Sequence, residues 1–190
     1  MVSGEKDELY QASTFDEAMN WLAVSNPLPF LRALIGAQGD SRLEDAHLRM
    51  KAKSMAGQYQ ALFGGLAREF DITLVAGSIV LPEPSVKDGA LSIGKGPLYN
   101  TSLVFGRDGA PIGQPQRQLS PSLAEQGFIR PSGDRAINVI QTPAGRLGVI
   151  VPIREQEALK KREWEKEGRE LLVTTGSPYG DPVFLDRAAE

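Results

Sequence analysis

Apolar residues in the first third of the chain recur at helical spacing. Thr14 and the glutamate three residues later match a capping box, which predicts a short helix over residues 15–24 that ends at Asn26-Pro27-Leu28-Pro29. Asp40 or Ser41 can cap a second, much longer helix. Its apolar positions mostly recur every three or four residues: Leu43, Ala46, Met50, Met55, Tyr59, Leu62, Leu66 and Phe70. This spacing predicts an amphipathic helix that packs on another layer.

The pattern changes to that of strands after residue 71. Residues 72–81 are apolar and rich in β-branched side chains, which predicts one buried strand. Residues 82–96 are expected to form a loop. Residues 98–105 lead into Arg107-Asp108-Gly109, and an Asp-Gly pair between two extended runs predicts a hairpin.

The second half of the chain contains the patterns of further strands and one helix. Pro143-Ala144-Gly145 lies between two extended runs and predicts a second hairpin. The predicted elements are strands over 137–140 and 147–151, a charged helix over 154–168, a buried strand over 171–175 and an irregular tail from residue 176. The alternation of helices and strands favours an α/β layered domain over a helical bundle or an all-β sandwich.

Length and composition suit one globular domain. The chain has 190 residues, of which 41% are hydrophobic and 24% charged. We expect a helical or irregular segment over 1–40, an α/β domain over 41–175 and a tail over 176–190. A net charge of −3 argues against nucleic acid and anionic membranes as partners. No apolar stretch is long enough to span a bilayer, so a cytoplasmic location is expected by default.

Cysteine and histidine, two common metal ligands, are scarce in this sequence. The sequence has no cysteine, which removes disulfides, thiolate metal sites and thiol nucleophiles together. His47, the single histidine, lies on a predicted helix without an acidic partner at metal spacing, so we expect an ordinary helix-surface residue. Residues 89–96 nearly match a phosphate-binding loop, but Gly96 replaces the Ser or Thr that would hold magnesium. We therefore expect a flexible loop, no metal and no cofactor.

Six short motifs resemble, in order, those of the nitrilase (carbon–nitrogen hydrolase) superfamily. They are a strand ending in Gly-Ser, a Tyr-Asn-Thr strand, a hairpin glycine, a basic element, a Phe-containing turn and a Gly-x-x-Gly strand. Here they are Ala76-Gly77-Ser78, residues 98–105, Gly109, residues 116–119, residues 128–133 and residues 142–151. The resemblance covers roughly residues 43–175. It implies a nitrilase-like α-β-β-α layered sandwich, incomplete at the N-terminal strand and the C-terminal end.

The resemblance also implies a catalytic set that this chain has in part. The family attacks nitriles or amides with a cysteine activated by a glutamate, while a lysine stabilises the developing charge, often with a second glutamate nearby. The cysteine position is Pro152, and the lysine position is Gln118. Nothing between residues 1 and 30 resembles the strand that carries the first glutamate. Glu125 matches the second glutamate, although it could equally be a surface acid.

Other candidate site residues lie close to these motifs. Lys95 and Arg117 are alternative sources of positive charge, although neither occupies the lysine position. The resemblance places Tyr99 and Asn100 near the pocket, where they could orient a ligand or simply pack and start a strand. The candidate ligand-binding residues are Tyr99, Asn100, Arg117 and Arg154.

Three functional hypotheses follow. The first is a carbon–nitrogen hydrolase domain, catalytically impaired because Pro152 replaces the cysteine, with a small amide or nitrile as ligand. The second is a non-catalytic binding or assembly module whose sheet edges are covered by a homo-oligomer or another partner. The third is a fragment of an active hydrolase, or a reading frame disrupted near Val151. The sequence favours no one substrate among nitriles, amides, ureas and N-carbamoyl compounds.

Overall fold

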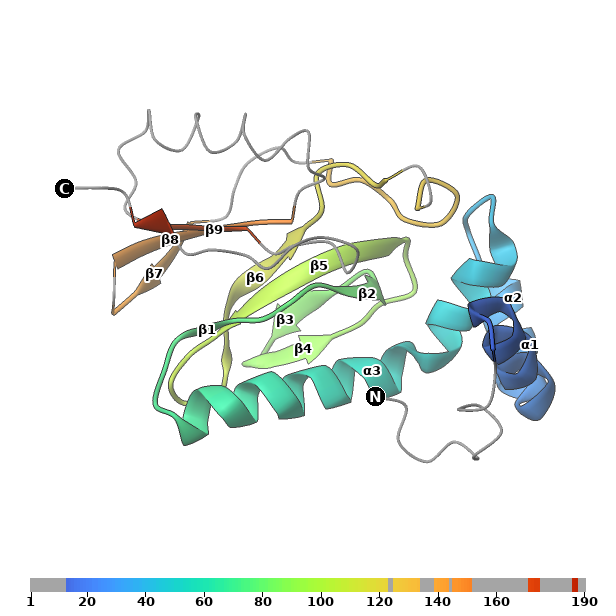
Figure 1. The fold of residues 1–190 in the computed structure, drawn as a ribbon, viewed down its shortest axis with the longest axis horizontal. Helices are drawn as coiled ribbons and strands as arrows, with labels where there is room; N and C mark the ends of the chain where they lie inside the picture. Colours follow the sequence, from blue (N-terminus) through green and yellow to red (C-terminus); the bar gives the residue numbers. More distant parts are fainter. Residues whose placement is uncertain are drawn as a thin grey trace.

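The computed structural model describes residues 13–122, 125–133, 139–143, 145–151, 171–174 and 186–187. These residues form three layers: a long helix, a first sheet and a second sheet (Figure 1). The helix packs on one face of the first sheet, and the second sheet packs on the other face. This arrangement gives the expected α/β layers, while the predicted helix over 154–168 lies outside the described residues.

Three helices precede the first strand: α1 (Phe15–Ser25), α2 (Pro27–Gly36) and α3 (Arg42–Glu69). The hydroxyl of Thr14 accepts the backbone N–H of Glu17, which confirms the predicted start of α1. The carboxylate of Glu17 accepts hydrogen bonds from the side chain and backbone of Ser13, and these lower its pKa. The predicted long helix is confirmed as α3. The sequence prediction missed α2, because Pro27 starts a new helix directly after α1 ends.

The first sheet is centred on β5 (Leu98–Phe105). β1 (Leu74–Val75) and β2 (Ile79–Pro82) pair antiparallel with successive parts of β5, and β6 (Pro111–Arg117) pairs along its other side. The prediction of one strand over residues 72–81 was wrong. The pairing of β2 with β5 is offset by one residue from that of β1, so the strand is interrupted between them. The hairpin predicted at Gly109 is confirmed.

A second hairpin lies in the segment that was predicted to be a loop. β3 (Ser85–Lys87) and β4 (Ala90–Ser92) pair through a two-residue turn at Asp88 and Gly89, both of which have positive φ. This geometry is typical of an Asp-Gly hairpin turn, and the signal was present in the sequence. The side-chain amide of Gln114, on β6, bonds both backbone groups of Val86 and fixes the hairpin against the sheet.

The second sheet has the order β10-β9-β8-β7 among the described residues. β7 (Val139–Thr142) and β8 (Gly145–Ile150) form the predicted second hairpin, and β9 (Leu171–Thr174) pairs in parallel with β8. β10 (Asp186–Arg187) pairs antiparallel with β9, so the tail predicted to be irregular contains a short strand.

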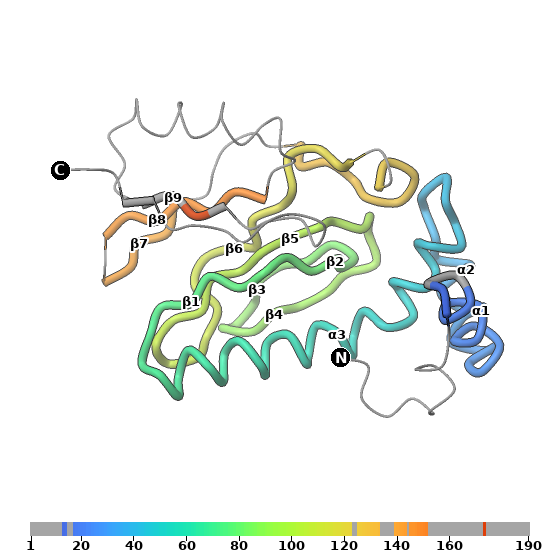
Figure 2. The backbone as a smooth tube through the Cα atoms, in the orientation of Figure 1, coloured from blue at the N-terminus to red at the C-terminus, as the bar shows by residue number. Residues whose placement is uncertain are grey.

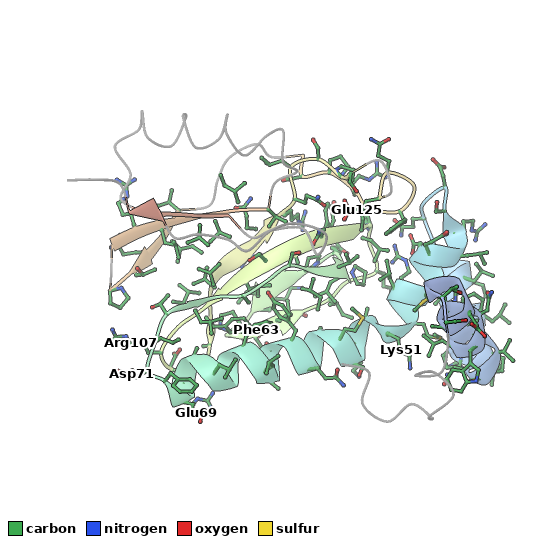
Figure 3. The ribbon with its side chains drawn as sticks, in the orientation of Figure 1. Lys51, Phe63, Glu69, Asp71, Arg107 and Glu125 are labelled. Atoms are coloured by element: carbon green, nitrogen blue, oxygen red, sulfur yellow. The ribbon has the colours of Figure 1, made fainter. Side chains whose placement is uncertain are left out.

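Alternate residues of β5 belong to two different cores. Leu103 and Phe105 pack with Tyr59, on α3, whereas Val104 packs with Val149 and other residues of the second sheet. Figure 3 shows Phe63 between α3 and the first sheet, where its ring stacks with that of Phe105. β5 is therefore a central strand with an α3 face and a second-sheet face.

Candidate polar site at the start of β5

Asn100 and Gln118 lie side by side on the second-sheet face. Thr101 is paired with Arg117, so Asn100 stands opposite Gln118, whose backbone N–H donates to the carbonyl of Asn100 over 2.8 Å. Directly opposed residues of an antiparallel pair extend to the same face, about 5 Å apart at Cβ. Asn100 is only 4% exposed and Gln118 only 2%. The two amide side chains are thus buried neighbours.

Glu125 is hydrogen-bonded to one member of this pair, Gln118. Its Oε2 accepts the side-chain N–H of Gln118 at 3.3 Å, and both the backbone N–H and the hydroxyl of Ser122 at 2.8 Å. Figure 3 places Glu125 beside the beginning of β5, on the opposite side of the sheet from Phe63. Glu125 is half-buried. All three of these donors are uncharged, and no ion pair to Glu125 is present within the described residues.

Two oxygens of the cluster have no hydrogen-bond partner among the described residues. They are Asn100 Oδ1 and Gln118 Oε1, and both are buried. A buried acceptor that is left unpaired costs about 1–3 kcal/mol, so such groups are uncommon in folded proteins and require an explanation. The cluster therefore contains unused capacity to accept hydrogen bonds, beside a carboxylate.

The segment after β6 is fixed against the same end of β5. The backbone N–H of Arg130 donates to Leu98 O, that of Ser132 donates to Gln118 O, and Ile129 forms a parallel bridge with Leu98. Three of the six motifs, which contain residues 98–105, 116–119 and 128–133, therefore meet at one place. The structure brings Asn100, Gln118 and Glu125 together there.

Tyr99 and Arg117 lie on the α3 face and do not join the cluster. The guanidinium carbon of Arg117 is 4.0 Å from the centre of the Tyr99 ring, and Arg117 Nη2 donates to Pro84 O over 3.4 Å. Lys95 is exposed, and its carbonyl accepts hydrogen bonds from Gln38 and Arg49. Within the described part of the chain, neither Lys95 nor Arg117 forms an ion pair with Glu125. The roles of Tyr99 and Arg117 in ligand binding, and of Lys95 as a source of positive charge, stay predictions.

Pro152 and Arg154 lie outside the described residues, so their roles also stay predictions. The preceding residue, Val151, is described and buried. In Figure 2, β8 runs toward the side of the molecule on which residues 118–122 and 125–133 lie. The positions of the Pro152 and Arg154 side chains are not part of the described structure.

Ser122 is a member of the cluster that the sequence prediction missed. It binds Glu125 with two hydrogen bonds, as the first residue of a Ser-x-x-Glu sequence. This spacing is the one found in capping boxes, in which a residue three positions later reaches back to a backbone N–H. The signal was recognised at Thr14 but not at Ser122, because no apolar helix follows it.

The remaining candidates lie outside the cluster. His47, predicted to be an ordinary surface residue, is half-buried, and its ring lies 4.8 Å from that of Phe30 on α2. In the loop compared with a phosphate-binding sequence, the N–H of Gly96 donates to the carboxylate of Glu83 instead. Within the described ranges, no three His, Cys, Asp or Glu side chains are grouped so that they could hold a metal ion. None of the described helices has the length and apolar composition needed to cross a membrane.

Comparisons with known proteins identify the family. A model of the carbon–nitrogen hydrolase family matches residues 31–183. Among solved structures, a carbon–nitrogen hydrolase from Helicobacter pylori G27 aligns with a TM-score of 0.51 and 18% identity, over 87% of this chain and 56% of that chain. A mutant of the amidase from Nesterenkonia sp. AN1 in complex with butyramide aligns with a TM-score of 0.50 and 18% identity, over 68% and 45% of the two chains. A comparison with curated proteins found no match.

The chain spans about half the length of these solved structures. At 18% identity, the likeness to them shows the fold. The match to the family covers most of the chain, and the motifs between residues 76 and 151 occur in the family's order. The chain therefore belongs to the carbon–nitrogen hydrolase family, within the nitrilase superfamily.

Proposed function

We propose that this chain is a carbon–nitrogen hydrolase domain that does not hydrolyse amides or nitriles through a thiol and that retains a polar site for a small ligand. The observation that carries the proposal is the hydrogen bond from Gln118 to Glu125, at the position where the family resemblance implies a lysine. The sequence also contains no cysteine, and Pro152 stands at the implied position of the nucleophile.

The chemistry of the family explains why these replacements matter. Attack on an amide or nitrile carbon needs an activated nucleophile and a fixed positive charge that stabilises the developing anion. Proline has no nucleophilic side chain. The amide of Gln118 is neutral, and it directs an N–H to Glu125. Neither part of the reaction is therefore provided by the residue at its implied position.

An ammonia-release assay on the purified chain, with short aliphatic amides and nitriles, tests this proposal. We expect the wild-type chain to give the same background rate as the Glu125→Gln variant. Glu69→Gln is the matched control, because Glu69 is an exposed acid at the far end of α3 (Figure 3). Ammonia release by the wild-type chain and by Glu69→Gln that is lost in Glu125→Gln would contradict the proposal.

A second candidate function is assembly with another copy of the same chain, supported by α2. Leu28, Leu31 and Ile35 recur at spacings of three and four residues on this helix, and all are exposed. Exposed Val24 and Leu43 flank α2 in the chain, and the only charged residue of α2 is Arg32. These five exposed apolar side chains lie on α2 or next to it in the sequence, and exposed apolar patches mark interaction surfaces. A weak homodimer would cover them.

Light scattering after size-exclusion chromatography, over a range of concentrations, tests assembly. We expect a concentration-dependent dimer for the wild-type chain and a monomer for Leu31→Glu. The control is Leu62→Glu on α3, because Leu62 is as exposed as Leu31, at 56% against 53%, and lies outside α2. A wild-type monomer at every concentration, or equal effects of the two substitutions, would contradict the assembly candidate.

A further inference from the structure

The carboxylate of Glu125 fixes the orientation of the Gln118 amide. An ionised carboxylate can only accept hydrogen bonds, so the amide group directed at Glu125 Oε2 must be the nitrogen. The oxygen of the same amide then points elsewhere and has no partner among the described residues. Gln118 consequently presents an acceptor to its surroundings, whereas a lysine at the same position would present donors.

Asn100 adds a second acceptor on the same face. Its Oδ1 is buried and has no partner within the described part of the chain. Because Asn100 and Gln118 stand opposite each other on paired strands, their side chains are neighbours. Two amide oxygens and the carboxylate of Glu125 therefore occupy one small region, and a ligand that fits them must be rich in donors.

The charges of the region favour a cation. The donors to Glu125 Oε2 from Gln118 and Ser122 are neutral. The ion pairs among the described residues join Arg49 to Asp45 and Arg107 to Asp71, and neither includes Glu125. Arg117 lies on the other face of the sheet, over Tyr99. A half-buried carboxylate attracts positive charge more strongly than one in water, because the local dielectric constant is lower.

Access and size limit the ligand to a small group. Residues 119–122 and Glu125, which adjoin the buried pair, are themselves half-buried. The cluster therefore lies close beneath the surface of the described residues. An NH3+ group has three N–H donors and no acceptor, which matches two amide oxygens and a carboxylate.

We propose that Asn100, Gln118 and Glu125 form a binding site for a small primary ammonium group. The inference rests on the proposed function, because a site that hydrolysed amides would need its cation where Gln118 presents an oxygen. A carboxylate or oxyanion ligand is disfavoured at this site, since it would bring acceptors against acceptors. The ligand class is therefore small primary amines in their protonated form.

Nuclear magnetic resonance on the 15N-labelled chain tests the site directly. The signals to follow are the side-chain amide resonances of Asn100 and Gln118 during titration with methylammonium chloride. Potassium chloride at the same ionic strength is the control for charge alone, and sodium acetate is the control for an anion. We expect saturable shifts of both amides with methylammonium and none with potassium or acetate.

Three variants separate specific binding from a loss of fold. Asn100→Leu removes one acceptor and should weaken methylammonium binding about tenfold or more, the effect of losing a hydrogen bond to a charged group. Gln118→Lys places an ammonium group within the cluster itself and should abolish binding, while the backbone spectrum stays that of the folded chain. Gln126→Leu, at an exposed residue next to Glu125, should leave the affinity unchanged.

The outcomes distinguish this inference from the proposed function. Absence of saturable shifts up to the solubility of the salt, equal shifts with potassium, or unchanged affinity in Asn100→Leu would each overturn the ammonium site. Such results would leave the proposed loss of hydrolysis standing. Ammonia release that depends on Glu125, in contrast, would overturn the proposed function without altering a measured affinity for methylammonium.

Discussion

The two faces of β5 differ in how completely their buried side chains are packed or hydrogen-bonded. On the α3 face, Phe105 is fully buried among aromatic rings, and Tyr59 uses its hydroxyl to donate to Gly77 O over 2.7 Å. On the second-sheet face, Asn100 and Gln118 are buried with oxygens that are unpaired among the described residues. The same strand therefore contributes to a fully packed core on one side and to an incompletely satisfied polar cluster on the other.

This contrast separates the part of the fold that stabilises the domain from the part in which unpaired buried groups destabilise it. Packed aromatic side chains stabilise a domain without further partners, whereas an unpaired buried acceptor destabilises it until a donor arrives. Destabilising groups of this kind concentrate at functional sites. Four predictions test the contrast, and the sizes of their expected effects decrease in turn.

Truncation on the α3 face should cause the largest loss of stability. Phe105→Ala removes a fully buried ring that packs with Tyr59 and Phe63, so we expect the free energy of unfolding to fall by about 3–5 kcal/mol. Urea denaturation followed by circular dichroism measures this change. A loss below about 1 kcal/mol would show that the α3 face is not a tightly packed core.

Two adjacent glycines of α3 should respond in opposite ways to the same substitution. A Cβ on Gly64 would lie 2.5 Å from the backbone oxygen of Gly109, whereas a Cβ on Gly65 would meet nothing within 4 Å. Gly64→Ala should therefore lower the free energy of unfolding by about 1–3 kcal/mol through overpacking. Gly65→Ala should raise it by up to about 1 kcal/mol, because alanine favours helices. Equal effects in urea denaturation would contradict the close approach of α3 to the β5–β6 turn.

Alkaline pH should weaken the α3 face through Tyr59. Burial raises the pKa of the Tyr59 phenol, so the folded state keeps it neutral where the unfolded chain ionises it. The stabilisation is complete below the unfolded pKa of about 10 and is lost as pH rises toward the folded pKa, by about 1.4 kcal/mol per pH unit. In Tyr59→Phe, the fall in unfolding free energy with rising pH that comes from this phenol should be absent. In Tyr99→Phe, it should remain. An identical pH dependence in Tyr59→Phe and wild type would disprove the assignment.

The smallest effects are expected on the second-sheet face. Asn100→Leu removes an unpaired buried oxygen at similar volume, so we expect the free energy of unfolding to stay within about 1 kcal/mol of wild type or to rise. Ser102→Ala is the matched comparison two residues along the same face, because the Ser102 hydroxyl donates to Ala76 O over 2.7 Å. It should lower stability by about 1 kcal/mol. A larger loss for Asn100→Leu than for Ser102→Ala would show that Asn100 is fully satisfied in the folded chain.

Several elements with regular local patterns were predicted from the sequence. The capping residues of α1, the long apolar stripe of α3 and the Asp-Gly turn at Gly109 act locally, and each appears in the structure. The interruption between β1 and β2 was not predictable, because it depends on their register against β5. The start of α2 was also missed, since Pro27 can end one helix or begin the next.

The candidate site was predictable as a set of positions but not as a geometry. The motif order indicated that Gln118, Glu125 and Asn100 belong to related segments, and the structure brings them together. The resemblance placed both Tyr99 and Asn100 near the pocket, although successive residues of a strand point to opposite faces. The unpaired state of the two amide oxygens was beyond sequence reasoning, because it depends on which atoms lie nearby in space.

A crystal structure of the chain grown in methylammonium chloride would be the decisive measurement for the polar cluster. We expect the ligand nitrogen within hydrogen-bond distance of both Asn100 Oδ1 and Gln118 Oε1, with Gln118 Nε2 still directed at Glu125. The proposed ammonium site would be disproved if both amide oxygens were instead hydrogen-bonded to groups of the protein. It would also be disproved if Asn100 and Gln118 faced opposite sides of the sheet.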